Sequence, residues 1–108
     1  MKTNSRMKSY YAVIFSSLRS VEDTPGYEET AARMLRLAEK QPGFLGFESV
    51  RDQHGAGISV SYWQDKESIK NWKNQADHLF AQKKGRTVWY LRYKIRIALV
   101  EDEYEYRK

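Results

Sequence analysis

Two histidines are the side chains of this 108-residue chain that titrate near neutral pH without help from their surroundings. His78 is the candidate general base, because a neutral imidazole can take a proton from a bound substrate and can also bind a metal. The alternative is a structural role, in which His78 caps a helix or makes one hydrogen bond. His54 stands beside Gly55 in a predicted turn, so we expect it to be exposed and without a role.

Aromatic side chains could form a pocket for a flat ligand, because rings stack on rings. Trp63 and Trp72 are candidates for its walls. Trp72 follows Ile69 at helical spacing, a pattern that more often marks the core, and we expect it there. Trp63 stays open between core and pocket, because it alternates with the apolar residues of its strand. Tyr93 could direct its hydroxyl into the pocket, and a buried tyrosine needs a hydrogen-bond partner in any case.

Polar candidates lie near the ends of predicted strands. Arg86 could hold a carboxylate or a developing phenolate, since a guanidinium group donates several hydrogen bonds in one plane. Ser17 could line the mouth of a pocket, but no histidine or carboxylate stands close to it in sequence as a nucleophile pair would require. Arg92 and Arg96 share one side of the last strand with Tyr90, and we expect that side to face solvent or a subunit edge.

The composition narrows the classes of cofactor and partner. Without cysteine the chain can form neither a disulfide nor a thiolate metal site. Two histidines and the lack of a glycine-rich phosphate loop predict that it needs no metal and no flavin. The net charge of +5 comes from 19 basic and 14 acidic residues, and the basic ones are spread along the chain apart from a small cluster at 83–86. We therefore expect no nucleic-acid partner.

The first nine residues are polar and basic, and no apolar stretch long enough for a signal peptide or membrane span follows them. We expect a flexible N-terminal segment over residues 1–9 and a single domain over 10–108. A cytoplasmic protein with no membrane partner is the expectation.

Alternating apolar residues predict four strands in this domain. They cover Tyr10–Phe15, Phe44–Arg51, Ile58–Trp63 and Trp89–Leu99, with a hairpin loop at 53–57 between the second and third. In the third strand the apolar side chains alternate with serines, which indicates a half-buried strand.

Two helical regions separate these strands. Thr24 and Pro25 begin the first, which a Pro-Gly pair ends. Asp65 can cap the second, Asn74 is predicted to break it, and a further helical segment ends at Gly85. The apolar stripe of the first helix consists of Tyr27, Ala31, Met34, Leu35 and Ala38.

The resulting β-α-β-β-α-β order predicts an α+β fold with a ferredoxin-like antiparallel sheet and helices on one face. The first strand is apolar on both sides, because Ala12 and Ile14 alternate with Val13 and Phe15. Something should therefore cover the helix-free face, and a second copy of the chain is the simplest candidate.

Several segments, taken together, resemble the antibiotic-biosynthesis-monooxygenase (ABM) family of dimeric α/β barrels, in particular its small single-domain bacterial members. In order and spacing they cover nearly the whole chain: Tyr11–Phe15, Pro42–Gly46, Ile58–Trp63, Ile69 with Trp72, His78 with Ala81, Gly85 with Arg86, and Trp89–Arg96. The resemblance implies a homodimer with a pocket between sheet and helices in each protomer. Family enzymes oxidise electron-rich aromatics there with molecular oxygen and no metal or flavin.

The resemblance thus implies a cofactor-independent monooxygenase acting on a small aromatic compound, and a non-catalytic ligand-binding or stress-related dimeric module is the alternative. One branch of the family degrades haem, but residues 10–18 lack that branch's asparagine and His78 falls closer to Trp72 than its pattern requires. RNA binding is disfavoured as well. Gly43–Val50 echoes an RNA-recognition motif on the wrong strand, and the third strand has serines where stacking rings would be needed.

Overall fold

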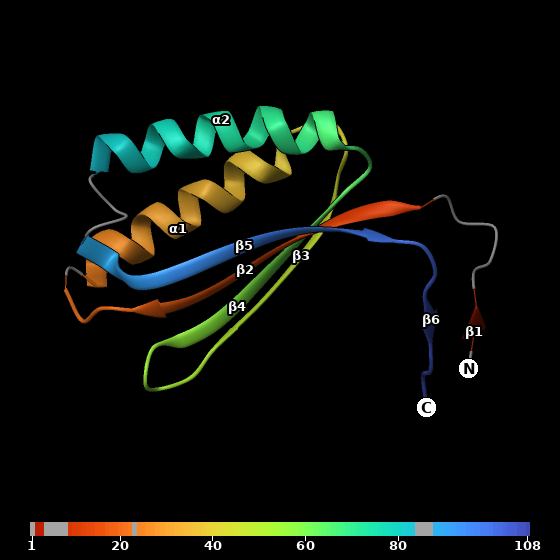
Figure 1. The fold of residues 1–108 in the computed structure, drawn as a ribbon, viewed down its shortest axis with the longest axis horizontal. Coiled ribbons are helices and arrows are strands. Elements are labelled where there is room, and N and C mark those ends of the chain that lie inside the picture. The colour runs from red at the N-terminus through yellow and green to blue at the C-terminus, as the bar shows by residue number, and fades with distance from the viewer. Residues whose placement is uncertain (1, 4–8, 23, 84–87) are drawn as a thin grey trace.

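The computed structural model describes residues 2–3, 9–22, 24–83 and 88–108, with all side chains in these ranges except those of 2–3 and 78–83. In chain order the elements are β1 (Lys2–Thr3), β2 (Tyr10–Arg19), α1 (Thr24–Glu39), β3 (Phe44–Arg51), β4 (Ala56–Trp63), α2 (Lys66–Lys83), β5 (Tyr90–Val100) and β6 (Tyr104–Glu105). The short strands β1 and β6 pair with each other near the two chain ends (Figure 1). Neither of them follows from the alternation that predicts the other four strands.

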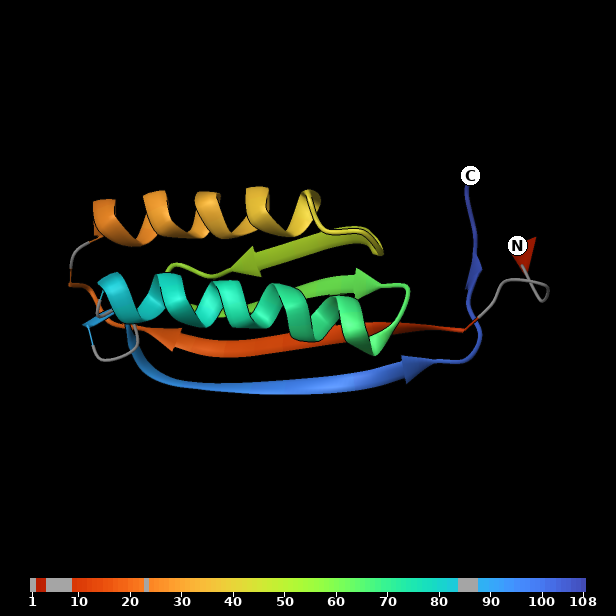
Figure 2. The same ribbon diagram turned by 90° about the horizontal axis from the view of Figure 1, so that it is seen from above.

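The main sheet has four antiparallel strands in the order β3-β4-β2-β5. Both helices lie on one face of it (Figure 1), and the view from above places β5 outside the two helices (Figure 2). This is the predicted ferredoxin-like α+β fold. Within the described part of the chain, no element covers the opposite face.

Helix α1 turns its buried side, including Thr30 and Ala38, toward the sheet. After it, Gly43 adopts a φ of +91°, a backbone conformation that residues other than glycine rarely adopt. A Cβ at this position would also overlap the Ser68 hydroxyl group, and the Gly43 carbonyl accepts a hydrogen bond from the Gln64 N–H at 2.7 Å. Glycine therefore lets the chain before β3 pack closely against the first turn of α2.

Helix α2 is continuous, so the predicted break at Asn74 is wrong. Asparagine costs an α-helix only about 0.7 kcal/mol relative to alanine, and burial of Ile69 and Ala76 on either side of it outweighs this. Asp65 caps the helix as predicted, because its carboxylate accepts the Ser68 N–H at 2.8 Å, a bond that lowers the pKa of Asp65. No helix in the described ranges is both long and apolar enough to cross a membrane.

The strand register decides which face of β4 meets the helices. Val13 lies opposite Ser61, and Tyr11 lies opposite Trp63, on the helix-covered face. Trp63 is fully buried there and belongs to the core cluster that includes Val13 and Ile69. The apolar residues of the other parity, Ile58, Val60 and Tyr62, lie on the helix-free face.

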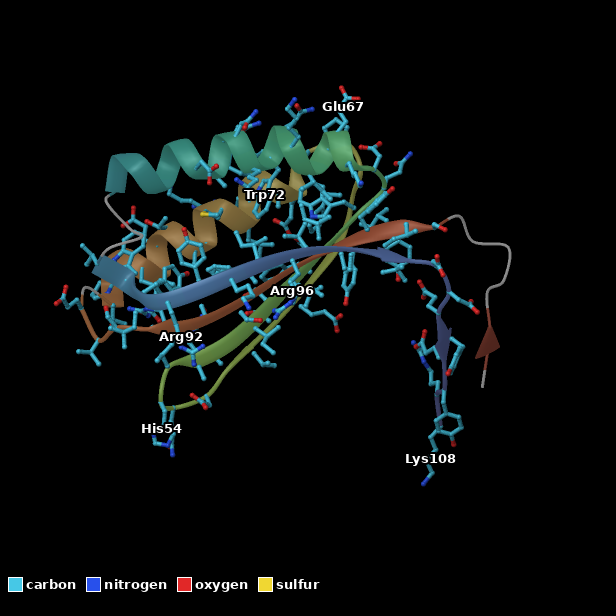
Figure 3. All side chains as sticks on the ribbon, in the orientation of Figure 1. His54, Glu67, Trp72, Arg92, Arg96 and Lys108 are labelled. Atoms are coloured by element: carbon cyan, nitrogen blue, oxygen red, sulfur yellow. The ribbon has the colours of Figure 1, made fainter. Side chains whose placement is uncertain are left out.

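Strand β5 begins at Tyr90 and contains an irregularity that the alternation did not predict. Leu18 pairs with Arg92, whereas the next residue, Arg19, pairs with Tyr90, so one extra residue is accommodated in β5 as in a β-bulge. Tyr90 therefore lies on the helix side with Phe15, and its predicted place beside Arg92 and Arg96 is wrong. Those two arginines point away from the helices (Figure 3).

Candidate functional site

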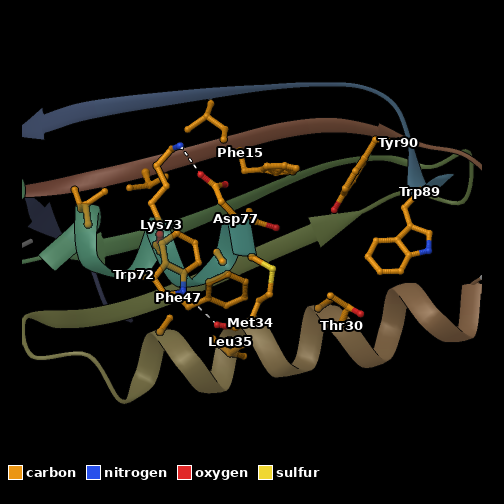
Figure 4. A pocket seen from close by; sticks show the side chains of 18 of the residues that line it. Phe15, Thr30, Met34, Leu35, Phe47, Trp72, Lys73, Asp77, Trp89 and Tyr90 are labelled. Carbon is orange, nitrogen blue, oxygen red and sulfur yellow. Dashed lines mark hydrogen bonds and ion pairs between the residues drawn. The ribbon is translucent and has the colours of Figure 1, made fainter. Parts of the chain in front are cut away.

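A cavity of about 160 Å³ lies between the sheet and the two helices, and Figure 4 shows it from close by. An apolar cavity of about 150 Å³ is large enough to bind benzene, so this one suits a small aromatic ligand. The residues that line it are Val13, Phe15, Tyr27, Thr30, Ala31, Met34, Leu35, Ala38, Phe47, Ser59, Ser61, Ile69, Trp72, Lys73, Ala76, Asp77, Trp89, Tyr90, Ile95 and Ile97.

Two serines of β4 line the cavity on its sheet side. Ser59 and Ser61 alternate on the helix-covered face, and their short side chains leave room beneath the helices. Their hydroxyl groups already have partners, because Ser61 accepts a hydrogen bond from the Trp63 indole at 2.8 Å and Ser59 pairs with Ser49 at 2.8 Å. The serines thus create space without leaving polar groups unsatisfied.

One wall is a stripe of α2 residues at helical spacing, from Ile69 to Asp77. Trp72 stands on this stripe, and its indole N–H donates to the Met34 carbonyl of α1 at 3.3 Å. At the rim, the Lys73 ammonium group lies 3.0 Å from the Asp77 carboxylate, and both side chains are about half exposed. Figure 4 shows this ion pair and Trp72 at one end of the cavity.

The other end is formed by aromatic side chains around Tyr90. The rings of Tyr27 and Phe15 meet the Tyr90 ring edge-on, at centroid distances of 5.9 and 5.2 Å, and Trp89 beside them is 2% exposed. Burial raises the pKa of the Tyr90 hydroxyl far above its usual range, and the Tyr27 hydroxyl adds to this effect. Tyr90 therefore stays a neutral phenol, able to donate a hydrogen bond, across the physiological pH range.

A family model described as antibiotic biosynthesis monooxygenase matches residues 11–84, which is more than half of the sequence. The chain belongs to the antibiotic biosynthesis monooxygenase family. A curated relative, the uncharacterized protein YqjZ of Bacillus subtilis (strain 168), is 55% identical over 92 residues, which are 85% of this chain and 80% of YqjZ.

Solved structures with the same fold include SnoaB, described as a cofactor-independent oxygenase from Streptomyces nogalater. It superposes with a TM-score of 0.59 at 15% identity, covering 94% of this chain and 96% of SnoaB. PA3566 from Pseudomonas aeruginosa gives a TM-score of 0.67 at 15% identity over 85% of this chain and 94% of its own. At 15% identity, the similarity to these two structures establishes the fold of this chain.

The structure places the predicted site residues unevenly. Trp72 lines the cavity and also packs against the core, whereas Trp63 lies in the core and is absent from the lining. Tyr93 stacks on Phe15 at 5.4 Å, is 40% exposed and lies outside the lining. Ser17 also lies outside it and accepts a hydrogen bond from Arg51 at 2.9 Å.

Two predicted site residues lie partly or wholly outside the described part of the structure. His78 lies within α2, but its side chain lies outside the described part of the structure, as does the whole of Arg86. His54 is exposed in the loop between β3 and β4, as expected (Figure 3). Among the described residues, no cluster of three or more histidine, aspartate or glutamate side chains could hold a metal ion.

Sequence reasoning missed Tyr27, Tyr90 and Arg51 as functional candidates. Tyr27 was predicted only as part of an apolar stripe, and Tyr90 was assigned to the wrong side of β5. Arg51 ends β3 and reaches Ser17 and Tyr27, which are 34 and 24 residues away in the chain. The one signal available was Gly57, whose position opposite Arg51 leaves space for a guanidinium group.

Proposed function

We propose that this protein is a cofactor-independent monooxygenase that acts on a small, electron-rich aromatic compound. Membership of the antibiotic biosynthesis monooxygenase family supports this proposal. The observation that carries it is the apolar, aromatic-lined cavity of about 160 Å³. SnoaB, which shares the fold, is described as a cofactor-independent oxygenase.

Such a compound can supply electrons to oxygen by itself once it has lost a proton. The protein then needs only to desolvate the substrate, orient it and stabilise the anion. For an anthrone, the balanced reaction converts the CH₂ group of the central ring to C=O with one atom of O₂, the other atom leaves as water, and four electrons pass from the substrate to oxygen.

A general base on α2 removes the proton in this proposal. His78 is the base that the sequence favours, and Asp77, whose carboxylate lines the cavity, is the alternative among the described residues. Trp72 offers a stacking surface. Tyr93, Ser17 and Arg86 remain candidates for contacts with a substrate that extends beyond the cavity.

Purified protein is expected to consume oxygen when given hydroxylated naphthoquinols or anthrones, with a chelator present and no flavin or metal added. An oxygen electrode measures uptake, and mass spectrometry after reaction with ¹⁸O₂ should find one labelled atom per product. The O-methyl ethers of the quinols and of the enol form of the anthrones serve as controls, because they cannot lose the acidic proton. Absence of uptake across the whole panel would contradict the proposal.

A non-catalytic ligand-binding module is the second candidate. Lys73 and Asp77 are the charged groups of the described lining, and they form an ion pair with each other, which favours a passive rim. In that case aromatic ligands bind at equilibrium without oxygen uptake.

We also propose that the protein works as a homodimer in which the helix-free faces of two sheets meet. Ile58 and Val50 are neighbours on this face and are 47% and 73% exposed, an apolar surface that a partner would cover. One row of paired residues on this face crosses the four strands and consists of Glu48, Val60, Ile14 and Arg96. A two-fold axis that reverses the row brings the Glu48 of one copy toward the Arg96 of the other.

Light scattering at micromolar concentration is expected to give twice the mass of one chain. Ile14→Glu should convert the protein to a monomer, because it buries an unpaired charge in the centre of the row. Val21→Glu is the matched control, since Val21 is 93% exposed and lies outside the sheet. A wild-type protein with the mass of one chain would remove the argument for a paired face.

A further inference from the structure

Two arginines flank Tyr27 at the aromatic end of the cavity. The Arg19 guanidinium carbon lies 3.6 Å from the centre of the Tyr27 ring, and the Arg51 guanidinium carbon lies 5.8 Å from it. Arg51 also donates hydrogen bonds to the Ser17 hydroxyl at 2.9 Å and to the Tyr27 hydroxyl at 3.4 Å. We define the arginine–tyrosine cluster as Arg19, Arg51, Tyr27 and Tyr90.

The backbone of β4 is shaped to admit Arg51. Gly57 lies opposite Arg51 in the strand register, and a Cβ on Gly57 would stand 2.6 Å from the guanidinium carbon. Any other residue at position 57 would therefore require the guanidinium group to shift. A third hydrogen bond, from Arg51 to the Gly55 carbonyl, also holds the side chain in this place.

Within the described part of the chain, the guanidinium groups of the cluster bond to neutral groups. Arg19 donates to the backbone carbonyls of Trp89 and Glu22, at 3.2 and 3.4 Å, and Arg51 bonds to hydroxyl and carbonyl groups. Among the residues that the structure describes, no carboxylate forms an ion pair with either guanidinium group. Two cations thus stand behind a wall whose cavity side is made of tyrosines.

The charge acts on the cavity itself. Tyr27 and Tyr90 both line it, and their hydroxyl groups bond to each other, so one of the two hydroxyl protons can be donated to an acceptor on a ligand. Both guanidinium groups lower the pKa of the Tyr90 hydroxyl, against the larger opposite effect of burial, so their field reaches that oxygen. The rim with Lys73 and Asp77 lies at the other end of the cavity (Figure 4).

We propose that the arginine–tyrosine cluster binds the oxygen substituent of the aromatic ligand in its anionic form. A Tyr27 or Tyr90 hydroxyl donates a hydrogen bond to the phenolate or enolate oxygen, and Arg51 and Arg19 supply the compensating charge. The preferred substrate class is then an aromatic ketone or phenol whose anion carries its charge on oxygen. With a base on α2, the proton leaves from the ring position far from that oxygen.

This inference rests on the proposed function for the location of the ligand. The probe is 4-nitrophenol, whose phenolate absorbs visible light, and 4-nitroanisole is the neutral analogue with the oxygen blocked. A nearby opposite charge lowers a pKa by about 1–3 units, so saturating wild-type protein should lower the pKa of bound nitrophenol by that amount. Above the pKa of the probe, nitrophenolate should bind at least about tenfold more tightly than nitroanisole.

Arg51→Met is expected to reduce the shift of the probe's pKa by at least about one unit. Tyr27→Phe keeps the ring beside Arg19 and removes only the hydroxyl, so it provides a second test if Arg51→Met does not fold. Arg36→Met is the matched control, because Arg36 is exposed in the last turn of α1, and the shift should be unchanged. Circular dichroism verifies the fold of each variant.

Failure of nitrophenol to bind, an unshifted pKa in the wild-type protein, or a shift that survives in both cluster variants would overturn the inference. These outcomes differ from failure of the proposed function. A protein that oxidises anthrones but binds nitrophenol in its neutral form is an oxygenase without the anionic site. A protein that shifts the pKa of the probe but consumes no oxygen has the site without the reaction.

Discussion

His78→Ala is expected to lower kcat for oxygen consumption by about 10²–10⁴-fold, the usual contribution of a general base. The fold should survive, and ligand affinity should change only modestly, because a proton-transfer group acts mainly in the transition state. Steady-state oxygen uptake with an anthrone measures kcat and KM, and isothermal titration with a non-reactive analogue measures affinity.

Asp77→Asn is the matched comparison, because asparagine keeps the shape of the aspartate and removes its basicity. Asp77 lines the cavity and forms an ion pair with Lys73 at 3.0 Å. If Asp77 takes the proton, Asp77→Asn loses activity and His78→Ala retains it, and the assignment of His78 falls. If His78→Ala instead melts the protein while ligands fail to bind, His78 is structural.

Trp63→Ala is expected to lower the free energy of unfolding by about 3–5 kcal/mol, since truncating a buried tryptophan removes its contacts and leaves a cavity. The Trp63 side chain is fully buried, and the centroid of its ring lies 5.4 Å from that of Phe44 and 5.3 Å from that of Trp72. It also donates a hydrogen bond to Ser61, which would lose this partner. Denaturant unfolding followed by circular dichroism, at one fixed protein concentration, measures the loss.

Trp72→Ala should cost less stability than Trp63→Ala, because Trp72 is only half-buried and faces a cavity that already exists. It should weaken aromatic ligand binding more, since it removes a stacking surface. Leu91→Ala provides the surface control, because Leu91 is 68% exposed. Equal stability losses for the two tryptophan variants would contradict the division between core and wall.

Local patterns in the sequence predicted most of the architecture. The strands are indicated by alternating apolar residues, and α1 by apolar residues at helical spacing. The cap at Asp65 is indicated by a short polar side chain before a helix with apolar residues. These signals are readable because each depends on residues within one or two turns of one another. The expectation that Asn74 breaks α2 failed because a weak local preference was set against burial that only tertiary packing supplies.

The sequence by itself determined the ferredoxin-like fold and supplied the aromatic residues that line the cavity. The tertiary structure alone decided which of these residues meet. The register placed Trp63 in the core, one extra residue in β5 turned Tyr90 toward the helices, and Arg51 reached Tyr27 across a glycine. The physical reason is that a one-residue shift in a strand exchanges its two faces, and no local pattern records where such a shift occurs.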